Sequence, residues 1–299
     1  MATAVANYEN RSTYRLPLSY AMIPPLVVAC IAPRLPAWVA AWLLALALFA
    51  MFKIWTLQNY ALRAHVPWSS AIAYLFAWPG MDPRSFVARE LRIPAPTAAE
   101  WSWAGGKTLL GVVLLWIVAP RLVDWNPLMG GWIGLVGLVF LLHFGLFHLL
   151  ALGWRRAGVA VEPLMHAPIL STSVSDFWSR RWNLAFRDLA QVFFFRPFVA
   201  SLGMGGAMMV VFTVSGLIHD LVISLPSGGG HGWPTLYFVM QGVAVLVEKS
   251  RVGRRFGLGR GARGRLFGWL VVVPGAYWLF HPPFVREVIL PTLSALHVF

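Results

Sequence analysis

Two polar positions stand out in a sequence that is otherwise built largely from apolar side chains. His219 lies inside the apolar run at 204–225, and Asn183 ends the stretch Ser-Asp-Phe-Trp-Ser-Arg-Arg-Trp-Asn that begins at Ser175. A run of that length is long enough to cross a bilayer, where an ionisable side chain is costly unless it has a task. Imidazole has an ordinary pKa of about 6.5, so it is neutral at pH 7 and can accept a proton from a hydroxyl group. His219 is therefore a candidate general base, and Asn183 offers an amide donor and acceptor.

The residues around His219 predict how its ring is surrounded. Ser215 lies one helical turn earlier on the same face, and Gly216 is expected to leave room beside the ring for a substrate. Asp220 is about 100° further round the helix. We expect it to cap, to pair with another helix or to hold local structure, and not to relay protons. A structural histidine is the alternative interpretation.

The stretch that ends at Asn183 carries most of the charge near the candidate base. On a helix, Asp176, Arg180, Asn183 and Arg187 share one face, and Asp176 can pair with Arg180. The other large side chains point elsewhere: Phe177, Trp178, Arg181 and Trp182. Two interpretations stay open, an interfacial amphipathic helix with tryptophan anchors or a polar face turned towards a reaction chamber.

The composition indicates that these residues sit in a membrane protein. Of the 299 residues 59% are hydrophobic and 12% are charged, against about 45–50% and 25% in soluble domains. No polar linker divides the chain, so a single membrane-embedded domain, 1–299, is expected. The one cysteine, Cys30, excludes an intrachain disulfide bond.

The net charge of +13 is carried by short loops between apolar segments. Positive-inside sorting and contact with membrane lipids explain that distribution better than nucleic-acid binding does. The loop 249–265 is strongly basic and 226–232 has no formal charge, so we place 249–265, 153–187 and 81–107 on the cytoplasmic side.

The apolar pattern predicts an all-α, polytopic transmembrane protein with about eight or nine membrane segments and a reaction chamber inside the membrane. A hairpin is expected from 16–32 and 36–52, then an interfacial stretch at 53–65 and a short segment at 66–78. Gly131, Gly134 and Gly137 predict close helix packing. The remaining expected segments are 109–119 (its run beginning near Ala104), 132–152, 188–199, 204–225, 233–247, 266–280 and 284–299.

Several chemistries lack their signatures in this sequence. The eight histidines form no cluster with the spacing of membrane di-iron enzymes, since His143 and His148 are five residues apart and His219 stands alone. No aspartate-rich prenyl-transfer motif, glycine-rich phosphate loop or Gly-x-Ser-x-Gly elbow is present. We therefore expect no metal site and no permanently bound cofactor.

Two motifs, in this order and spacing, resemble a known family. The stretch 175–183 and Val-Ser-Gly-Leu-Ile-His-Asp at 214–220 resemble the two signature regions of the membrane-bound O-acyltransferases, in particular the wax-synthase-like branch. Trp-Pro-Gly-Met-Asp-Pro-Arg at 78–84 is similar to a short sequence motif of the same branch. The resemblance runs from Trp78 to Val247. The chain departs from it in its compact length and in having Asp220 where many members have glutamate.

The resemblance implies the fold, the reaction and the roles of the two polar residues. It makes His219 the catalytic base and Asn183 its partner, in a transfer of an acyl group from acyl-CoA to a lipophilic alcohol. Acyl-CoA is then a co-substrate, and its phosphates are expected to meet Arg180 and Arg181. The expected substrate-binding residues are Asp176, Trp178, Arg180, Arg181, Trp182, Ser215 and Gly216.

Alternatives stay open for the substrate and for the class of protein. A natural-product or sterol-like hydroxyl is the second acceptor class, and a transporter with an intramembrane histidine is the rival function, although no internal repeat is found. The bias towards Ala, Gly, Arg and Trp suggests a bacterial inner membrane, or the endoplasmic reticulum in a eukaryote. The sequence gives no oligomeric state. The enzymatic interpretation requires one chamber that reaches from Asn183, near the cytoplasmic surface, to His219, deep in the membrane.

Overall fold

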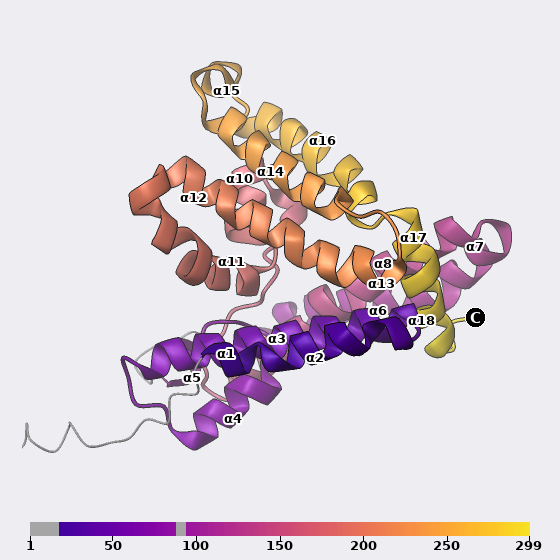
Figure 1. Cartoon of the computed structure of the whole chain (residues 1–299), viewed down its shortest axis with the longest axis horizontal. Helices are drawn as coiled ribbons and strands as arrows, with labels where there is room; N and C mark the ends of the chain where they lie inside the picture. The colour runs from indigo at the N-terminus through magenta and orange to yellow at the C-terminus, as the bar shows by residue number, and fades with distance from the viewer. Residues whose placement is uncertain (1–17, 88–93) are drawn as a thin grey trace, which may run out of the picture.

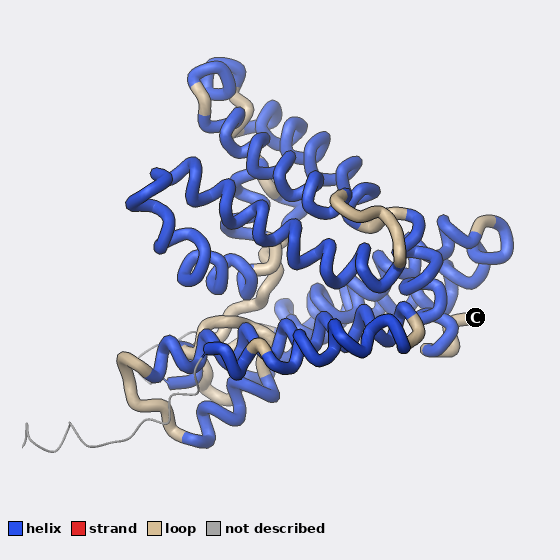
Figure 2. Tube along the Cα trace, in the orientation of Figure 1, coloured by secondary structure: helices blue, strands red, loops and turns tan. Residues whose placement is uncertain are grey.

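The computed structural model describes residues 18–87 and 94–299, and every regular element within them is a helix (Figures 1 and 2). The all-α prediction is confirmed for this part of the chain. The start of the expected segment 16–32 and the centre of the expected loop 81–107 fall outside the described residues.

The first described helices form the expected hairpin. The elements are α1 (Leu18–Ala21), α2 (Ile23–Ile31), the 3-10 turn η1 (Ala32–Arg34) and α3 (Ala37–Ala61). α3 continues without a break through residues 53–61, so the stretch expected to be interfacial belongs to the same helix as the apolar segment before it. The helix can continue because Lys53, the one charged side chain in this part of α3, is buried and hydrogen-bonded.

Lys53 fastens the segment after the short helix α4 (Trp68–Ala77) to α3. Its Nζ donates to the carbonyls of Trp78 at 2.9 Å and Gly80 at 2.7 Å, and it lies 3.1 Å from the centroid of the Tyr74 ring. The Tyr74 hydroxyl is in turn 2.6 Å from Oγ1 of Thr56. The chain then enters α5 (Arg84–Val87). Residues 78–84, picked out by sequence resemblance, thus form a turn held by a buried lysine.

The next long helix begins earlier and ends later than expected. α6 (Ala98–Val113), the π-helical turn η2 (Leu114–Val118) and α7 (Ala119–Trp125) form one continuous run. A capping box between Thr97 and Glu100 starts the helix inside the predicted polar loop. The expectation that the loop 81–107 extends to Lys107 is therefore wrong, since its residues from Ala98 onwards are helical.

A second continuous run follows, made of α8 (Pro127–Val139), the π-helical turn η3 (Phe140–Leu146) and α9 (Phe147–Arg156). The three glycines that predicted close packing do pack closely. A Cβ atom at Gly131 would meet Val285, one at Gly134 would meet Leu293, and one at Gly137 would meet Leu115.

The site-bearing part of the chain starts with short elements and continues in one long bent run. The short elements are η4 (Pro168–Leu170), α10 (Val174–Asp176) and the π-helical turn η5 (Phe177–Arg181). The long run is made of α11 (Leu184–Ala190), η6 (Gln191–Phe195), α12 (Arg196–His219), η7 (Asp220–Ser224) and α13 (Leu225–Ser227).

This run is bent at Gly203, where φ is 66° and ψ is 176°. That backbone region is essentially restricted to glycine. The sequence predicts two elements here, 188–199 and 204–225, and the bend falls between them. α11 and the end of α12 therefore point in different directions (Figure 1).

The C-terminal helices match the expected segments 233–247, 266–280 and 284–299. They are α14 (Trp233–Lys249), α15 (Arg251–Phe256), α16 (Gly261–Leu279), α17 (Pro282–Phe284), the π-helical turn η8 (Val285–Ile289) and α18 (Leu290–Ala295). α14 packs between α12 and α16, and η8 reaches back to α3 and α8. Figure 1 shows α12, α14 and α16 as one group, joined to the group containing α2 and α3 at the end where α13 and α17 lie.

Four helical runs in the described residues are long and apolar enough to cross a membrane. They are Ala37–Ala61, Ala98–Trp125, Pro127–Arg156 and Leu184–Ser227. The expected count of eight or nine membrane segments is not confirmed. Ile23–Arg34 and Trp68–Ala77 are apolar but short, α14 has only 17 residues, and two expected segments merge into the bent run.

The buried lysine provides a test of the fold. Replacing Lys53 with Met keeps the apolar stem but leaves the buried carbonyls of Trp78 and Gly80 without a donor. We expect Lys53→Met to lower the free energy of unfolding by about 2–4 kcal/mol, measured by thermal unfolding in detergent. Arg63→Met, at an exposed position just past the same helix, serves as the control and should change stability by less than about 0.5 kcal/mol. Equal losses in both variants would contradict the role of Lys53.

Candidate active site

A chamber of about 680 Å³ opens between η3, the segment 165–191, α12, α14 and α16. Its walls are mainly aromatic and aliphatic, and both Asn183 and His219 line it. The requirement that the two side chains share one cavity is therefore met.

His219 is held in one tautomer by its own helix. Its Nδ1 lies 2.6 Å from the carbonyl oxygen of Ser215, and because a carbonyl can only accept, Nδ1 carries the proton. In the neutral ring, Nε2 then carries the lone pair, and within the described residues it makes no hydrogen bond. The ring packs on Phe238 with centroids 4.5 Å apart. The arrangement suits a group that accepts a proton from a ligand in the chamber.

Asn183 occupies a break between two helices. Trp182 is extended, and Asn183 has φ 43° and ψ 64°, in the left-handed region that asparagine tolerates better than most residues. Its Oδ1 accepts from the N–H of Phe186 at 3.3 Å and so caps α11, while its own N–H donates to Sδ of Met165. Among the described residues the side-chain nitrogen Nδ2 has no partner. The amide can therefore donate to a ligand without losing the cap.

This break corrects the helix face predicted from spacing. The helix that contains Asp176 ends at Arg181 in a π-helical turn, and a new helix starts after Asn183. Asn183 and Arg187 therefore do not continue a face shared by Asp176 and Arg180. The π-helical turn and the left-handed backbone of Asn183 both interrupt the helix. A prediction from residue spacing assumes a regular helix and therefore misses them.

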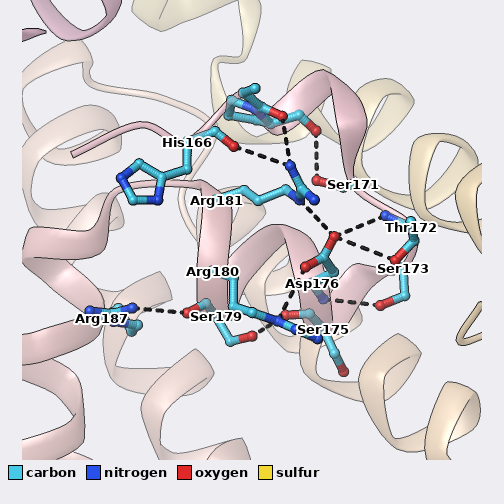
Figure 3. A network of polar contacts seen from close by, with 12 residues as sticks. His166, Ser171, Thr172, Ser173, Ser175, Asp176, Ser179, Arg180, Arg181 and Arg187 are labelled. Atoms are coloured by element: carbon cyan, nitrogen blue, oxygen red, sulfur yellow. Dashed lines mark hydrogen bonds and ion pairs between the residues drawn. The ribbon is translucent and has the colours of Figure 1, made fainter. Parts of the chain in front are cut away.

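Asp176 is the centre of a structural network on the chain before the break (Figure 3). Its carboxylate accepts from Nε of Arg181 at 2.7 Å and from the N–H of Thr172 at 3.1 Å, and it pairs with Arg180 at 3.2 Å. Burial alone raises the pKa of Asp176, but these hydrogen bonds and charges outweigh it and hold the pKa below its usual value. Arg181 also donates to the carbonyls of His166 and Ala167.

The structure divides the expected substrate-binding residues into two groups. Trp178, Trp182 and Ser215 line the chamber; Asp176, Arg180, Arg181 and Gly216 do not. The space next to Gly216 is filled by the backbone of Thr235, because α12 and α14 pack closely there. This corrects the expectation that the glycine makes room for a substrate beside the ring.

The two tryptophans of the chamber wall are fixed by their neighbours. The Trp178 indole donates to Oε1 of Gln241 at 3.1 Å, and Gln241 donates to the carbonyl of Val271 on α16. Trp182 stacks on Phe177 with centroids 5.4 Å apart. Neither ring can turn away without breaking these contacts, so the wall beside Asn183 is rigid.

Asp220 holds local structure, as expected from its position. Its carboxylate accepts from Ser224 Oγ at 2.9 Å, from the N–H of Gly232 at 2.8 Å, and from the N–H of Thr235 at 3.0 Å. A further bond comes from the Thr235 hydroxyl. Asp220 thus fixes the end of α12 to the start of α14 and takes no part in orienting the His219 ring.

Several chamber residues have no signal in the two sequence motifs. Lys249 and Arg187 bring positive charge, Gln191 and His143 bring further polar groups, and Tyr237 supplies aromatic surface. They come from three separate helical runs, so only the folded chain brings them together. His143 was noticed in the sequence only as a possible metal ligand.

The long apolar helices and this site define a helical integral membrane protein with a histidine and an asparagine facing one apolar chamber. Residues 161–240, which include both side chains, match the model of the membrane bound O-acyl transferase family. This match and the relatives described in the next paragraph confirm the resemblance to this family and its wax-synthase-like branch. The turn at 78–84 lies outside the matched residues.

Proteins similar to this chain include plant acyltransferases. The chain is 36% identical over 142 residues to the long-chain-alcohol O-fatty-acyltransferase of Simmondsia chinensis. The matched region makes up 44% of this chain and 40% of that protein. The chain is also 34% identical over 145 residues to the probable long-chain-alcohol O-fatty-acyltransferase 9 of Arabidopsis thaliana, with 44% and 42% covered. It is 28% identical over 137 residues to Acyl-CoA–sterol O-acyltransferase 1 of the same plant, a match that covers 42% of this chain and 39% of that protein. The matched part thus spans about two fifths of these relatives.

The Asp176 network predicts a pH-dependent stability. Because the folded-state pKa of Asp176 lies below its unfolded value of about 3.9, its stabilising effect is complete above that pH and is lost as pH falls through the folded pKa. Asp176→Asn should therefore be less stable than the wild type by about 1–3 kcal/mol at pH 7, and this difference should shrink on acidification.

Thermal unfolding in detergent across the acidic range measures this difference. Glu162→Gln, at an exposed carboxyl in the same segment, is the matched control and should leave the unfolding temperature nearly unchanged. A stability difference for Asp176→Asn that stays constant down to the lowest pH would show that the carboxylate charge is unimportant.

Proposed function

We propose that this chain is an O-acyltransferase that moves an acyl group from acyl-CoA to the hydroxyl group of a lipophilic alcohol, acting as one membrane-embedded domain. The observation that carries the proposal is the pairing, in one apolar chamber, of a histidine with a free Nε2 and an asparagine with a free amide donor. The match of residues 161–240 to a family of acyltransferases supports it.

His219 acts on the acceptor. Its Nε2 takes the proton of the alcohol hydroxyl while the alcohol oxygen attacks the thioester carbonyl carbon. The hydrogen bond from Nδ1 to the Ser215 carbonyl then stabilises the imidazolium that forms. Collapse of the tetrahedral intermediate breaks the carbon–sulfur bond, and the imidazolium returns its proton to the leaving thiolate of CoA. The products are an ester and free CoA.

Asn183 acts on the acyl donor. Its Nδ2 donates to the thioester oxygen, which becomes negatively charged in the tetrahedral intermediate. A fixed hydrogen-bond donor in an apolar chamber stabilises this negative charge far more than the same donor would in water. The cap on α11 holds the amide in place, so the donor needs no reorganisation when the charge develops.

The CoA part of the donor meets the cationic side of the chamber. Lys249 and Arg187 line it, and within the described residues the Lys249 ammonium has no ion-pair or hydrogen-bond partner. Arg180 is 76% exposed and can also reach phosphate, whereas Arg181 is occupied by Asp176 and two carbonyls. We therefore transfer the phosphate-binding role expected for Arg181 to Lys249, and keep Arg180 in it. Arg187 lines the chamber, but it is paired with Asp188 and donates to the carbonyl of Ser179.

A long-chain alcohol is the acceptor that fits best, because the chamber walls are aromatic and aliphatic and two relatives carry long-chain-alcohol acyltransferase names. A sterol-like hydroxyl is the second candidate, supported by the similarity to a sterol acyltransferase. The relatives are plant proteins, so they lend no support to the bacterial inner membrane suggested by composition. Acyl-CoA is used as a co-substrate, with no permanently bound cofactor.

The base is tested with a variant that keeps its structural hydrogen bond. The amide of His219→Asn can still donate to the Ser215 carbonyl in place of Nδ1, but it cannot accept a proton. We expect ester formation from labelled acyl-CoA and hexadecanol in purified membranes to fall by at least about 100-fold. Unfolding temperature should stay close to that of the wild type. Ester formation that survives this change would refute the mechanism.

The donor role of Asn183 is tested by a change of one atom type. Asp at position 183 keeps an oxygen that caps α11 and tolerates the left-handed backbone, but it loses the amide N–H. We expect Asn183→Asp to lower the turnover number by about 100- to 1000-fold with little change in stability. If Asn183→Asp were fully active, the amide would serve only as the helix cap.

The same assay separates the proposal from the rival class. Ester formation with sterols but not with long-chain alcohols would select the second acceptor. Saturable solute uptake into vesicles, with no ester from any alcohol, would select a transporter.

A further inference from the structure

The turn at 78–84 resembles a family motif, yet none of its residues lines the chamber. Its structure is nevertheless closely specified. Nζ of Lys53 fixes the carbonyls of Trp78 and Gly80, and a Cβ atom at Gly80 would lie 2.2 Å from Nε1 of the Trp78 indole. A lysine inside a spanning helix is costly unless it has a task. The position of this turn therefore matters to another part of the protein.

The turn and α11 share one buried apolar cluster. Met81, in the middle of the turn, is 8% exposed and lies in this cluster with Ala185 and Leu189 of α11. The remaining buried members come from α1 and α3 and are Ala21, Leu48, Met51 and Phe52. One side of α11 is therefore packed on α3 and on the turn that Lys53 fixes to α3.

The start of α11 is connected to the same turn through Leu164. The N–H of Leu184, the first residue of α11, donates to the carbonyl of Leu164 at 3.0 Å. The side chain of Leu164 packs against the cluster that contains Met81 and also against the cluster that contains Trp78. Two side chains of the turn therefore support the first turn of α11.

The opposite side of α11 faces the chamber and carries the Asn183 amide at its start. α11 has only seven residues and begins at a left-handed break, so no preceding helix fixes its position. Oδ1 of Asn183 accepts from the N–H of Phe186, so the amide moves with this helix. Arg187 lines the chamber, and Ala185 and Leu189 lie about 200° round the helix from it. The packing of that far side therefore sets where the amide points.

We propose that the turn at 78–84 is a support that places the Asn183 amide against the thioester oxygen, and that Met81 is the side chain through which it holds α11. Met81 is a positioning residue, because it touches neither substrate and acts through the Nδ2 donor of Asn183. Catalysis is sensitive to such placement, since a displacement of about 1 Å can lower a rate about 100-fold. This inference rests on the acyltransferase function proposed above, and within it on the donor role of Asn183.

The test is a double-mutant cycle measured on turnover of labelled acyl-CoA and hexadecanol. Met81→Ala removes the packing on α11, and we expect it to lower kcat by about 10- to 100-fold, with KM for hexadecanol close to that of the wild type. In an Asn183→Asp background, which already lacks the donor, the same change should lower kcat by less than about threefold. Met81→Leu conserves the side-chain volume and should keep most of the wild-type turnover.

Leu44→Ala is the matched control. Leu44 is fully buried on the same helix α3, but its cluster contains no residue of α11. We expect this change to lower the unfolding temperature at least as much as Met81→Ala does, while kcat per folded protein stays near the wild-type value. A loss of kcat in Leu44→Ala equal to that in Met81→Ala would overturn the proposal, because general loosening of the fold would then explain both.

Two further outcomes would overturn it. One is a Met81→Ala protein with wild-type kcat, and the other is a double variant in which the two losses multiply, because Met81 would then act independently of Asn183. An inactive wild type would instead refute the proposed function, and binding of two unreactive acyl-CoA analogues then decides this inference. A ketone analogue keeps the carbonyl oxygen and a thioether analogue lacks it, so the wild type should bind the ketone about 5- to 10-fold more tightly. Met81→Ala and Asn183→Asp must both lose this preference and Leu44→Ala must keep it; any other pattern overturns the proposal.

Discussion

Hydrogen-bonding groups inside this protein must find their partners within the protein, because hydrocarbon offers none. The structure obeys this constraint in several places. Lys53 is buried in a spanning helix and satisfied by the carbonyls of Trp78 and Gly80, and Trp178 is satisfied by Gln241. His219 uses one ring nitrogen on its own helix, which leaves the other for chemistry.

The site depends on interrupted helices. Asn183 lies in a left-handed break, and His219 is the last residue before a π-helical turn. Regular helices would satisfy all backbone groups but would turn every fourth side chain to the same face. The interruptions instead direct an amide and an imidazole from separate segments into one cavity, at the cost of local backbone bonds that caps and neighbouring side chains replace.

Much of this arrangement could be predicted from the sequence. The apolar runs predicted an all-helical membrane protein, the glycines at 131, 134 and 137 predicted close packing, and the isolated His219 marked the site because lipid disfavours it. The ends of helices were less accessible. Lys53 resembles an interfacial residue until its carbonyl partners are known, and the helix starting at Ala98 is set by a cap within a polar stretch.

The composition of the chamber could not be predicted, since it depends on contacts between distant segments. Lys249 and His143 come from different helices and Asn183 from a break between two others, and no spacing rule relates them. The face shared by Asp176 and Asn183 was predicted for a regular helix and is interrupted at Trp182. Arg181 likewise looked like a ligand-binding cation, but its geometry commits it to Asp176.

The bend at Gly203 has a consequence for the dimensions of the site. As one straight helix, Leu184–Ser227 would be about 66 Å long at 1.5 Å per residue, twice the thickness of a bilayer core of about 30 Å. Asn183 immediately precedes this run and His219 lies near its other end. The backbone angles of Gly203 therefore set how far apart the two ends of this run lie, and with that the separation of Asn183 and His219 across the chamber.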